Sequence, residues 1–417
     1  MSKKLDKKRI GRIFPILIFL LFLCCGMVIS VLKPDEDYSK EENRLLQQAP
    51  EITVKSIKTG EFQKEYETYL SDQFIGRDRF VQIKSTLQYW LGKRDMNGVF
   101  FGTDGYLLEQ YKKRDFDWQT MDDNAWFTAD FLAAMQESYG QGHVYAMFVP
   151  SKGTVLQNRL PLFKKIYDTT YIVDYVKKYL KQDYDLSGDM VIDLTDTLKK
   201  HDEEYIFYRT DHHWTTLGAY YAYEKYKEIN GQNPLGKEAY DIATVTEDFL
   251  GTTYDKVQVK TKADSITQWS LKEGDNAVSV IFDQGDIVWD TFYSKKELKN
   301  KDKYQYFLGG NTAQIHIHTQ AQNKKTLLLL KDSYSNCFVE FLTPDYEDIY
   351  MIDLRYTNEN IYDIIEGIEK NQPITDVLVM YNMEKFMKDS NLEQLEYQGE
   401  DLWEEEFEEE DAEDEQE

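Results

Sequence analysis

Two segments far apart in the sequence contain the residue types of nucleophilic catalysis. The first, YRTDHHWTTLG, places Asp211, His212 and His213 at a turn between an extended run and a helical run. In an extended stretch residues i and i+2 point the same way, so Asp211 can orient the His213 imidazole and stabilise its protonated form. A histidine general base requires such a partner. The alternative is a capping aspartate beside hydrogen-bonded histidines.

The second segment, TLLLLKDSYSN, places a serine where a nucleophile is expected. Residues 326–330 form a continuous apolar run, which is typical of a central parallel strand. Ser333 follows at the junction of this strand with a predicted helix, where backbone N–H groups can stabilise an oxyanion. Open α/β sheets carry their sites at this edge. The alternative is that Asp332, Ser333 and Ser335 only cap the helix.

Two further polar residues follow predicted strands. Asn382 ends the apolar run of TDVLVMYN, where its amide can donate to a developing oxyanion; the alternative is a turn asparagine. Arg355 follows DIYMIDL and can contact a carboxylate or a polysaccharide, or else pair with Asp353. The other candidate oxyanion or substrate contacts flank the main candidates: Asp332, Tyr334, His212 and Trp214.

A metal site is a weaker possibility. His316 and His318 alternate on one strand face and could bind a metal together with His212 and His213. Metal ligands usually come with more carboxylate or cysteine support, and no cysteine-rich zinc motif occurs. We therefore predict neither a metal nor a cofactor, and His316 and His318 as an exposed strand face.

The elements that must position these residues alternate between strands and helices. This pattern predicts an α/β domain over residues 61–390, with a parallel sheet flanked by helices. Residues 235–310 are rich in Thr, Val, Tyr and Asp and predict an inserted, mostly antiparallel β segment. Residues 391–417 carry fifteen acidic side chains and no basic one, which predicts a disordered acidic tail.

The N-terminus predicts the location of the protein. Residues 1–12 are mainly basic and should be cytoplasmic, and residues 13–32 are uncharged and long enough for a single-pass signal-anchor in the cell membrane. Residues 33–60 are predicted to be a stalk, which puts the catalytic domain outside the cytoplasm. A cleaved signal peptide is the alternative.

Composition limits the possible functions. The chain has 417 residues, 41% hydrophobic and 14% aromatic, which suffices for a packed core. The net charge of −26 repels phosphate backbones and disfavours nucleic-acid binding. Of three cysteines, only Cys337 lies in the body of the chain, so no disulfide can form there.

With TDHHWT and KDSYS both present, the chain resembles the DHHW family of bacterial surface proteins. That family is similar to the catalytic domains of the alginate O-acetyltransferases and belongs to the SGNH hydrolase-like superfamily. Further stretches that carry the resemblance are ENRLL, FVPSKGTVLQNRLP, FLGTTYDK and FLGGN. The resemblance implies an SGNH hydrolase-like fold, with Ser333 as nucleophile, His213 as base and Asp211 as its partner.

Three functions follow from this resemblance. The first is an extracytoplasmic O-acetyltransferase that modifies a cell-surface or exported polysaccharide, with a membrane-bound O-acyltransferase as the partner that supplies the acyl group. The second is a polysaccharide acetyl esterase with the same triad. The third is a non-catalytic polysaccharide-binding or assembly protein.

Overall fold

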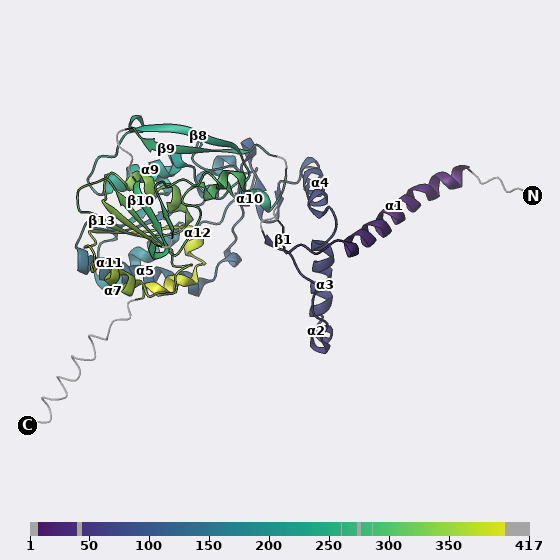
Figure 1. The fold of residues 1–417 in the computed structure, drawn as a ribbon, viewed down its shortest axis with the longest axis horizontal. Helices are drawn as coiled ribbons and strands as arrows, with labels where there is room; N and C mark the ends of the chain where they lie inside the picture. The colour runs from purple at the N-terminus through teal and green to yellow at the C-terminus, as the bar shows by residue number, and fades with distance from the viewer. Residues whose placement is uncertain (1–6, 40–43, 260, 273–276, 286, 397–417) are drawn as a thin grey trace, which may run out of the picture. The chain divides into compact units, whose positions relative to one another are not determined.

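The structure of the chain is a computed structural model (Figure 1), and the chain divides into two compact units. The first unit comprises Met1–Val99 and Thr252–Thr261, and the second comprises Phe100–Gly251 and Lys262–Glu417. Residues 61–99 therefore belong to the first unit, whereas the sequence prediction starts the catalytic domain at residue 61. The structure describes every residue except 1–6, 40–43, 260, 273–276, 286 and 397–417.

The first unit is largely helical, and it includes structure within the predicted stalk. Asp72, at the end of α3, accepts hydrogen bonds from both guanidinium nitrogens of Arg44, at 2.9 and 2.5 Å, and from the backbone N–H of Gln47. These contacts tie Arg44 and Gln47 to the end of α3. The elements are α1 (Lys7–Leu32), β1 (Tyr38–Ser39), β2 (Arg44–Leu45), α2 (Val54–Thr59), α3 (Glu61–Asp72), α4 (Arg77–Trp90), β3 (Asp95–Met96) and α10 (Thr252–Asp255).

The uncharged segment 13–32 lies within α1, which starts before it at Lys7. Pro15 lies inside this helix and not in its first turn, so its missing N–H removes one intrahelical hydrogen bond. Within the part of the chain that the structure describes, no helix combines the length and the hydropathy that a membrane crossing requires. The anchor at residues 13–32 stays a prediction from the sequence.

An eight-stranded mixed sheet forms the centre of the second unit (Figure 1). Strands β14, β13, β15, β6 and β7 are neighbours in this order and run parallel. Three of them are buried along their whole length, as their apolar sequences predict. Their bounds are β6 (Val144–Val149), β7 (Val191–Asp193), β13 (Thr326–Lys331), β14 (Asp348–Ile352) and β15 (Asp376–Asn382).

The β-rich segment 235–310 divides between two sheets. Strands β8 (Tyr240–Phe249) and β9 (Asp264–Leu271) form an antiparallel pair of their own. Strands β10 (Ala277–Phe282) and β11 (Ile287–Trp289) instead extend the central sheet through β12 (Gln314–Thr319), with antiparallel pairing throughout. The insertion is thus antiparallel, as predicted, but part of it is continuous with the main sheet.

Helices cover the sheet on both sides, with α5, α7 and α11 on one side and α9 on the other (Figure 1). Helix α11 shows why such helices pack: Ile361, Ile364, Ile365 and Ile368 are buried along one stripe, and the Asn360 side chain caps the first turn. The other α-helices and strands are β4 (Val99–Phe101), β5 (Leu107–Glu109), α5 (Trp118–Tyr139), α6 (Lys152–Val155), α7 (Tyr171–Tyr184), α8 (Thr195–Lys199), α9 (Thr216–Ile229), α11 (Ile361–Glu369) and α12 (Met383–Phe386). The 3-10 helices that the text refers to below are η8 (Lys303–Tyr306), η9 (Ser333–Cys337), η10 (Val339–Leu342) and η11 (Ser390–Leu395).

The first residues of the predicted acidic tail, 391–396, are part of the folded second unit. Ser390–Leu395 form η11, and both Leu392 and Leu395 are fully buried in the core of the second unit. Burial of these two leucines orders the first residues of the predicted tail. Residues 397–417, to which the rest of that prediction applies, lie outside the described residues.

A buried carboxyl group, Glu340, lies in η10. One of its oxygens accepts a hydrogen bond from the Tyr293 hydroxyl, and the other has no partner among the described residues. Burial raises the pKa of Glu340 from its ordinary value of 4.5 to about 8, so the folded protein holds it as the neutral acid at pH 7.

We predict that Glu340 makes the protein less stable as the pH rises from about 4.5 to about 8. In this window the unfolded chain releases the Glu340 proton while the folded chain keeps it, so the contribution to stability is complete below pH 4.5 and lost by about pH 8. In Glu340→Gln this contribution should be absent. Urea unfolding across this range should therefore show a flatter pH dependence for the variant. Parallel curves for the two proteins would contradict the assignment.

Candidate active site

The first candidate segment forms a tight loop before α9. Phe207 and Trp214 pair as an isolated antiparallel bridge, and the Tyr208 N–H donates to the carbonyl of His213 at 3.2 Å. Helix α9 starts immediately afterwards, and the Thr215 side chain caps it by accepting a hydrogen bond from the Gly218 N–H. The loop therefore presents the two histidines at the start of a capped helix, as the sequence predicts.

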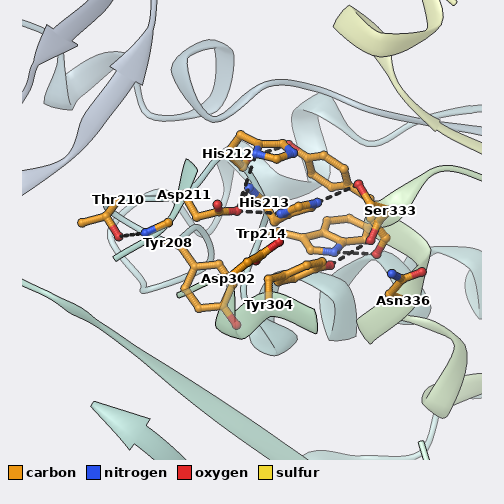
Figure 2. A network of polar contacts seen from close by, with 12 residues as sticks. Tyr208, Thr210, Asp211, His212, His213, Trp214, Asp302, Tyr304, Ser333 and Asn336 are labelled. Atoms are coloured by element: carbon orange, nitrogen blue, oxygen red, sulfur yellow. Dashed lines mark hydrogen bonds and ion pairs between the residues drawn. The ribbon is translucent and has the colours of Figure 1, made fainter. Parts of the chain in front are cut away.

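The structure brings Asp211, His213 and Ser333 together in one hydrogen-bonded row (Figure 2). His213 Nδ1 lies 2.6 Å from Asp211 Oδ1, and His213 Nε2 lies 2.7 Å from Ser333 Oγ. The His213 backbone N–H also donates to Asp211 Oδ1 at 3.0 Å. Asp211 is fully buried and His213 is 5% exposed, so their contacts are shielded from bulk water, whereas Ser333 is partly exposed.

The charge state of Asp211 determines which atom donates and which accepts in each hydrogen bond of this row. Burial alone would raise the pKa of Asp211, but its electrostatic interactions with His212 and His213 and the two hydrogen bonds from His213 hold it well below its usual range. An ionised carboxylate only accepts, so Nδ1 of His213 donates to it. In a neutral imidazole this leaves Nε2 to accept the Ser333 hydroxyl proton, as activation of a serine requires.

His212 lies against the face of the His213 ring, with centroids 3.8 Å apart (Figure 2). Burial and the neighbouring charge of His213 lower the pKa of His212. His212 is therefore neutral at neutral pH and adds no second positive charge to the row. Its backbone carbonyl accepts a hydrogen bond from the Tyr334 hydroxyl at 2.6 Å.

The turn that carries Ser333 is held by the residue before it. Asp332 Oδ1 accepts from the Tyr334 N–H at 2.9 Å, and Asp332 Oδ2 accepts from the Asn382 N–H at 2.8 Å. Burial raises the pKa of Asp332. Asp332 therefore caps η9, the alternative considered for it, and fixes Ser333 at the end of β13. The expected helix after Ser333 is replaced by the 3-10 helices η9 and η10.

Trp214 and Tyr334 join the two candidate segments. The Trp214 indole N–H donates to the Tyr334 carbonyl at 3.0 Å, and Trp214 is fully buried. We call residues 208–214 the DHH loop and residues 332–336 the serine turn. Together with the hydrogen bond from the Tyr334 hydroxyl to the His212 carbonyl, the indole contact joins this loop to this turn twice. Both side chains therefore fix the position of the loop relative to the turn.

Asn382 and Arg355 adopt the structural alternatives considered for them. The Asn382 amide donates to the Val149 carbonyl at 3.1 Å, and its oxygen accepts from the Lys385 N–H, which caps α12. Arg355 forms two hydrogen bonds to Asp353, at 2.8 and 2.6 Å. Both side chains are thus engaged by protein groups at the carboxyl edge of the sheet.

His316 and His318 do not join the other histidines. Both lie on β12 and contact one oxygen of Asp348, at 2.7 and 2.9 Å, at the amino end of β14. In the described part of the chain, the one group of side chains close enough to hold a metal ion is Asp211, His212 and His213. An ion there would compete with the hydrogen bonds that His213 makes.

Lys331, which precedes the serine turn, is fully buried. Its ammonium group donates to the side-chain oxygens of Asn311 and Asn336, at 3.0 and 2.9 Å, and lies 3.4 Å from Asp353. Burial lowers its pKa to about 8. Lys331 therefore ties the loop at Asn311 to the turn that carries Ser333.

Lys152 is a buried cation that the sequence analysis does not single out, although it lies in the family-like stretch FVPSKG. Its ammonium group donates to the carbonyls of Tyr208, Arg209 and Asp211, at 2.9, 3.2 and 2.7 Å. These carbonyls belong to the DHH loop. Lys152 therefore holds that loop against the end of β6.

Two further residues restrain the same loop. Asp264 is fully buried and accepts from the N–H groups of Arg209 and Thr210, both at 2.7 Å. Gly251 lies so close to Asp211 that a Cβ on Gly251 would come within 2.3 Å of the Asp211 Cβ. Only glycine fits there, and this explains why the stretch FLGTTYDK has a glycine at position 251.

Comparison with known proteins agrees with this fold. The family described as DHHW protein matches residues 130–352. A crystal structure of a DHHW family protein from Eubacterium siraeum DSM 15702 is 25% identical, with a TM-score of 0.57 over 72% of this chain and 95% of that one. Bacillus cereus PatB1 with a sulfonyl adduct is 22% identical, with a TM-score of 0.55 over 70% of this chain and 98% of that one.

A more distant similarity is to the O-acetyltransferase domain of Pseudomonas putida AlgJ, which is 14% identical over 72% of this chain and 98% of that one, with a TM-score of 0.44. No curated protein sequence matches the chain. The fold and the site define a mixed α/β protein with a DHHW loop facing a serine turn. The chain belongs to the DHHW family, as the sequence motifs indicate.

We predict that Lys152→Met lowers the free energy of unfolding by roughly 2–3 kcal/mol, because three buried carbonyls lose a charged donor. Urea unfolding measures the change. The exposed Lys165 provides a matched control, since Lys165→Met removes the same group from solvent. Equal unfolding midpoints for the two variants would show that Lys152 does not hold the loop.

Proposed function

We propose that this protein is an extracytoplasmic O-acetyltransferase that modifies a cell-surface or exported polysaccharide through an acyl-Ser333 intermediate. The observation that carries the proposal is the row from Asp211 through His213 to Ser333, with hydrogen-bond distances of 2.6 and 2.7 Å. The choice of acetyl transfer and of a polysaccharide rests on the resemblance to the DHHW family and the alginate O-acetyltransferases.

In the first half of the reaction Ser333 Oγ attacks the carbonyl carbon of the acyl donor, and His213 Nε2 takes the hydroxyl proton. Asp211 stays ionised and stabilises the imidazolium. We assign the oxyanion to the N–H of Ser333, at the start of η9, since Asp332 already occupies the Tyr334 N–H. The donor's leaving group then departs with the proton from His213, which leaves acyl-Ser333.

In the second half a sugar hydroxyl attacks the acyl carbon while His213 takes its proton. The bond between the acyl carbon and Ser333 Oγ breaks, and the serine oxygen regains the proton from His213. The products are an O-acylated sugar and free Ser333. With water in place of the sugar, the same steps make an esterase.

Two partners complete the proposal. The acceptor is a polysaccharide, and the donor is a membrane-bound O-acyltransferase that delivers the acyl group. Both follow from the family resemblance, because acetyl-CoA is not available outside the membrane. No cofactor is required by the steps above.

The extracytoplasmic location rests on the sequence, where basic residues 3–12 precede the uncharged segment 13–32. We expect protease added to intact cells to digest the domain that carries Ser333. Protection of that domain, with digestion only after lysis, would contradict this location.

The purified full-length chain, given p-nitrophenyl acetate and oligosaccharide acceptors, should release p-nitrophenol and add an acetyl group to the sugar. Ser333→Ala should lower both rates by roughly 10³-fold or more. Ser335→Ala is the matched control, because Ser335 lies in the same turn and its hydroxyl has no partner among the described residues. It should keep both rates within about 2-fold.

The outcomes separate the three functions. Ser333-dependent release with acetylated sugar supports the transferase. Ser333-dependent release without acetylated sugar favours the esterase. Equal rates for the wild type and Ser333→Ala would contradict the triad and leave a polysaccharide-binding protein.

A further inference from the structure

Tyr304 contacts two members of the row without belonging to it (Figure 2). Its ring stacks on the His213 imidazole, with centroids 3.7 Å apart and planes at 6°. Its hydroxyl donates to the Ser333 carbonyl at 2.9 Å. Figure 2 shows His212 on one side of the His213 ring and Tyr304 on the other. The imidazole is therefore held between two rings.

The β-rich insertion supplies this tyrosine. Tyr304 lies in η8, and the chain on its C-terminal side pairs with residues 292–294: the Ser294 N–H donates to the Tyr306 carbonyl at 2.7 Å, and the Leu308 N–H donates to the Phe292 carbonyl at 2.7 Å. Tyr304 itself is 4% exposed. The insertion thus places a fixed, buried ring beside the histidine.

We infer that Tyr304 is a positioning residue whose ring and hydroxyl have separate tasks, an inference that rests on the proposed function. The ring holds the His213 plane so that Nδ1 and Nε2 point at Asp211 and Ser333 together. The hydroxyl fixes the backbone of Ser333, and this in turn fixes the position of Ser333 Oγ relative to His213 Nε2.

The ring has a second effect during the reaction. When His213 takes the serine proton it becomes a cation, and an aromatic face at 3.7 Å attracts that cation. His213 on its own could rotate about its side-chain bonds and lose one of its two partners. Stacking on a buried ring restricts that rotation.

Two substitutions separate the tasks. Tyr304→Phe keeps the ring and removes the hydroxyl, so kcat for p-nitrophenyl acetate should fall about 3- to 10-fold. Tyr304→Leu removes both, so kcat should fall roughly 30-fold or more. KM should change less than about 2-fold in either variant, since the buried side chain does not reach the substrate.

Tyr208→Phe is the matched control. Tyr208 is fully buried, meets the Tyr304 ring edge-on at 6.2 Å, and its hydroxyl has no partner among the described residues. This variant should keep kcat within about 2-fold. A kcat for Tyr304→Leu equal to that of Tyr208→Phe, or a loss seen in KM alone, would overturn the inference. If Tyr304→Leu fails to fold, Tyr304→Phe against Tyr208→Phe still tests the hydroxyl.

A measurement that does not depend on catalysis distinguishes failure of the Tyr304 inference from failure of the proposed function. The chain has six histidines, so the ring protons of His213 can be assigned in an NMR spectrum by comparison with His213→Gln. The ring current of Tyr304 should shift these protons upfield in the wild type and in Tyr304→Phe, but not in Tyr304→Leu. Equal shifts in all three proteins would overturn the stacking, whereas equal activity of the wild type and Ser333→Ala would contradict only the proposed function.

Discussion

The hydrogen bond between Asp211 and His213 Nδ1 is the contact on which the other features of the site depend. A carboxylate without solvent is costly unless several donors surround it. His213 supplies two of them, from its ring and its backbone. Such a contact forms only if the loop is fixed, and this explains the buried Lys152 and Asp264 that bind the loop's backbone. Two buried charges of opposite sign thus hold one short loop.

Three distant parts of the chain meet at the carboxyl edge of the sheet. The parallel strand β13 ends at the turn of Ser333, the loop before α9 brings His213, and the insertion brings Tyr304. Trp214 and Tyr334 join the first two parts through hydrogen bonds. Because each part is anchored separately, the geometry of the row depends on the packing of the whole second unit and not on any one element.

The sequence predicts what local patterns determine. Continuous apolar runs identify the central strands, since a strand buried on both faces has no polar side. The i, i+2 spacing correctly places Asp211 and His213 on one side. Local patterns do not reveal which strands join a sheet, so the union of β10 and β11 with the main sheet was not predicted. They also cannot separate an oxyanion donor from a cap, as Asn382 shows. No sequence feature distinguishes Tyr304 from the other tyrosines of the chain, which has 31 in all.

The central claim, that His213 and Asp211 activate Ser333, is tested most directly by labelling with phenylmethylsulfonyl fluoride and peptide mass spectrometry. A sulfonyl fluoride reacts with an activated serine and needs neither acceptor nor acyl donor. Labelling should give a single adduct on Ser333, which His213→Gln abolishes and Ser335→Ala leaves unchanged. An unlabelled wild type, an adduct at another residue, or equal labelling of His213→Gln would contradict it.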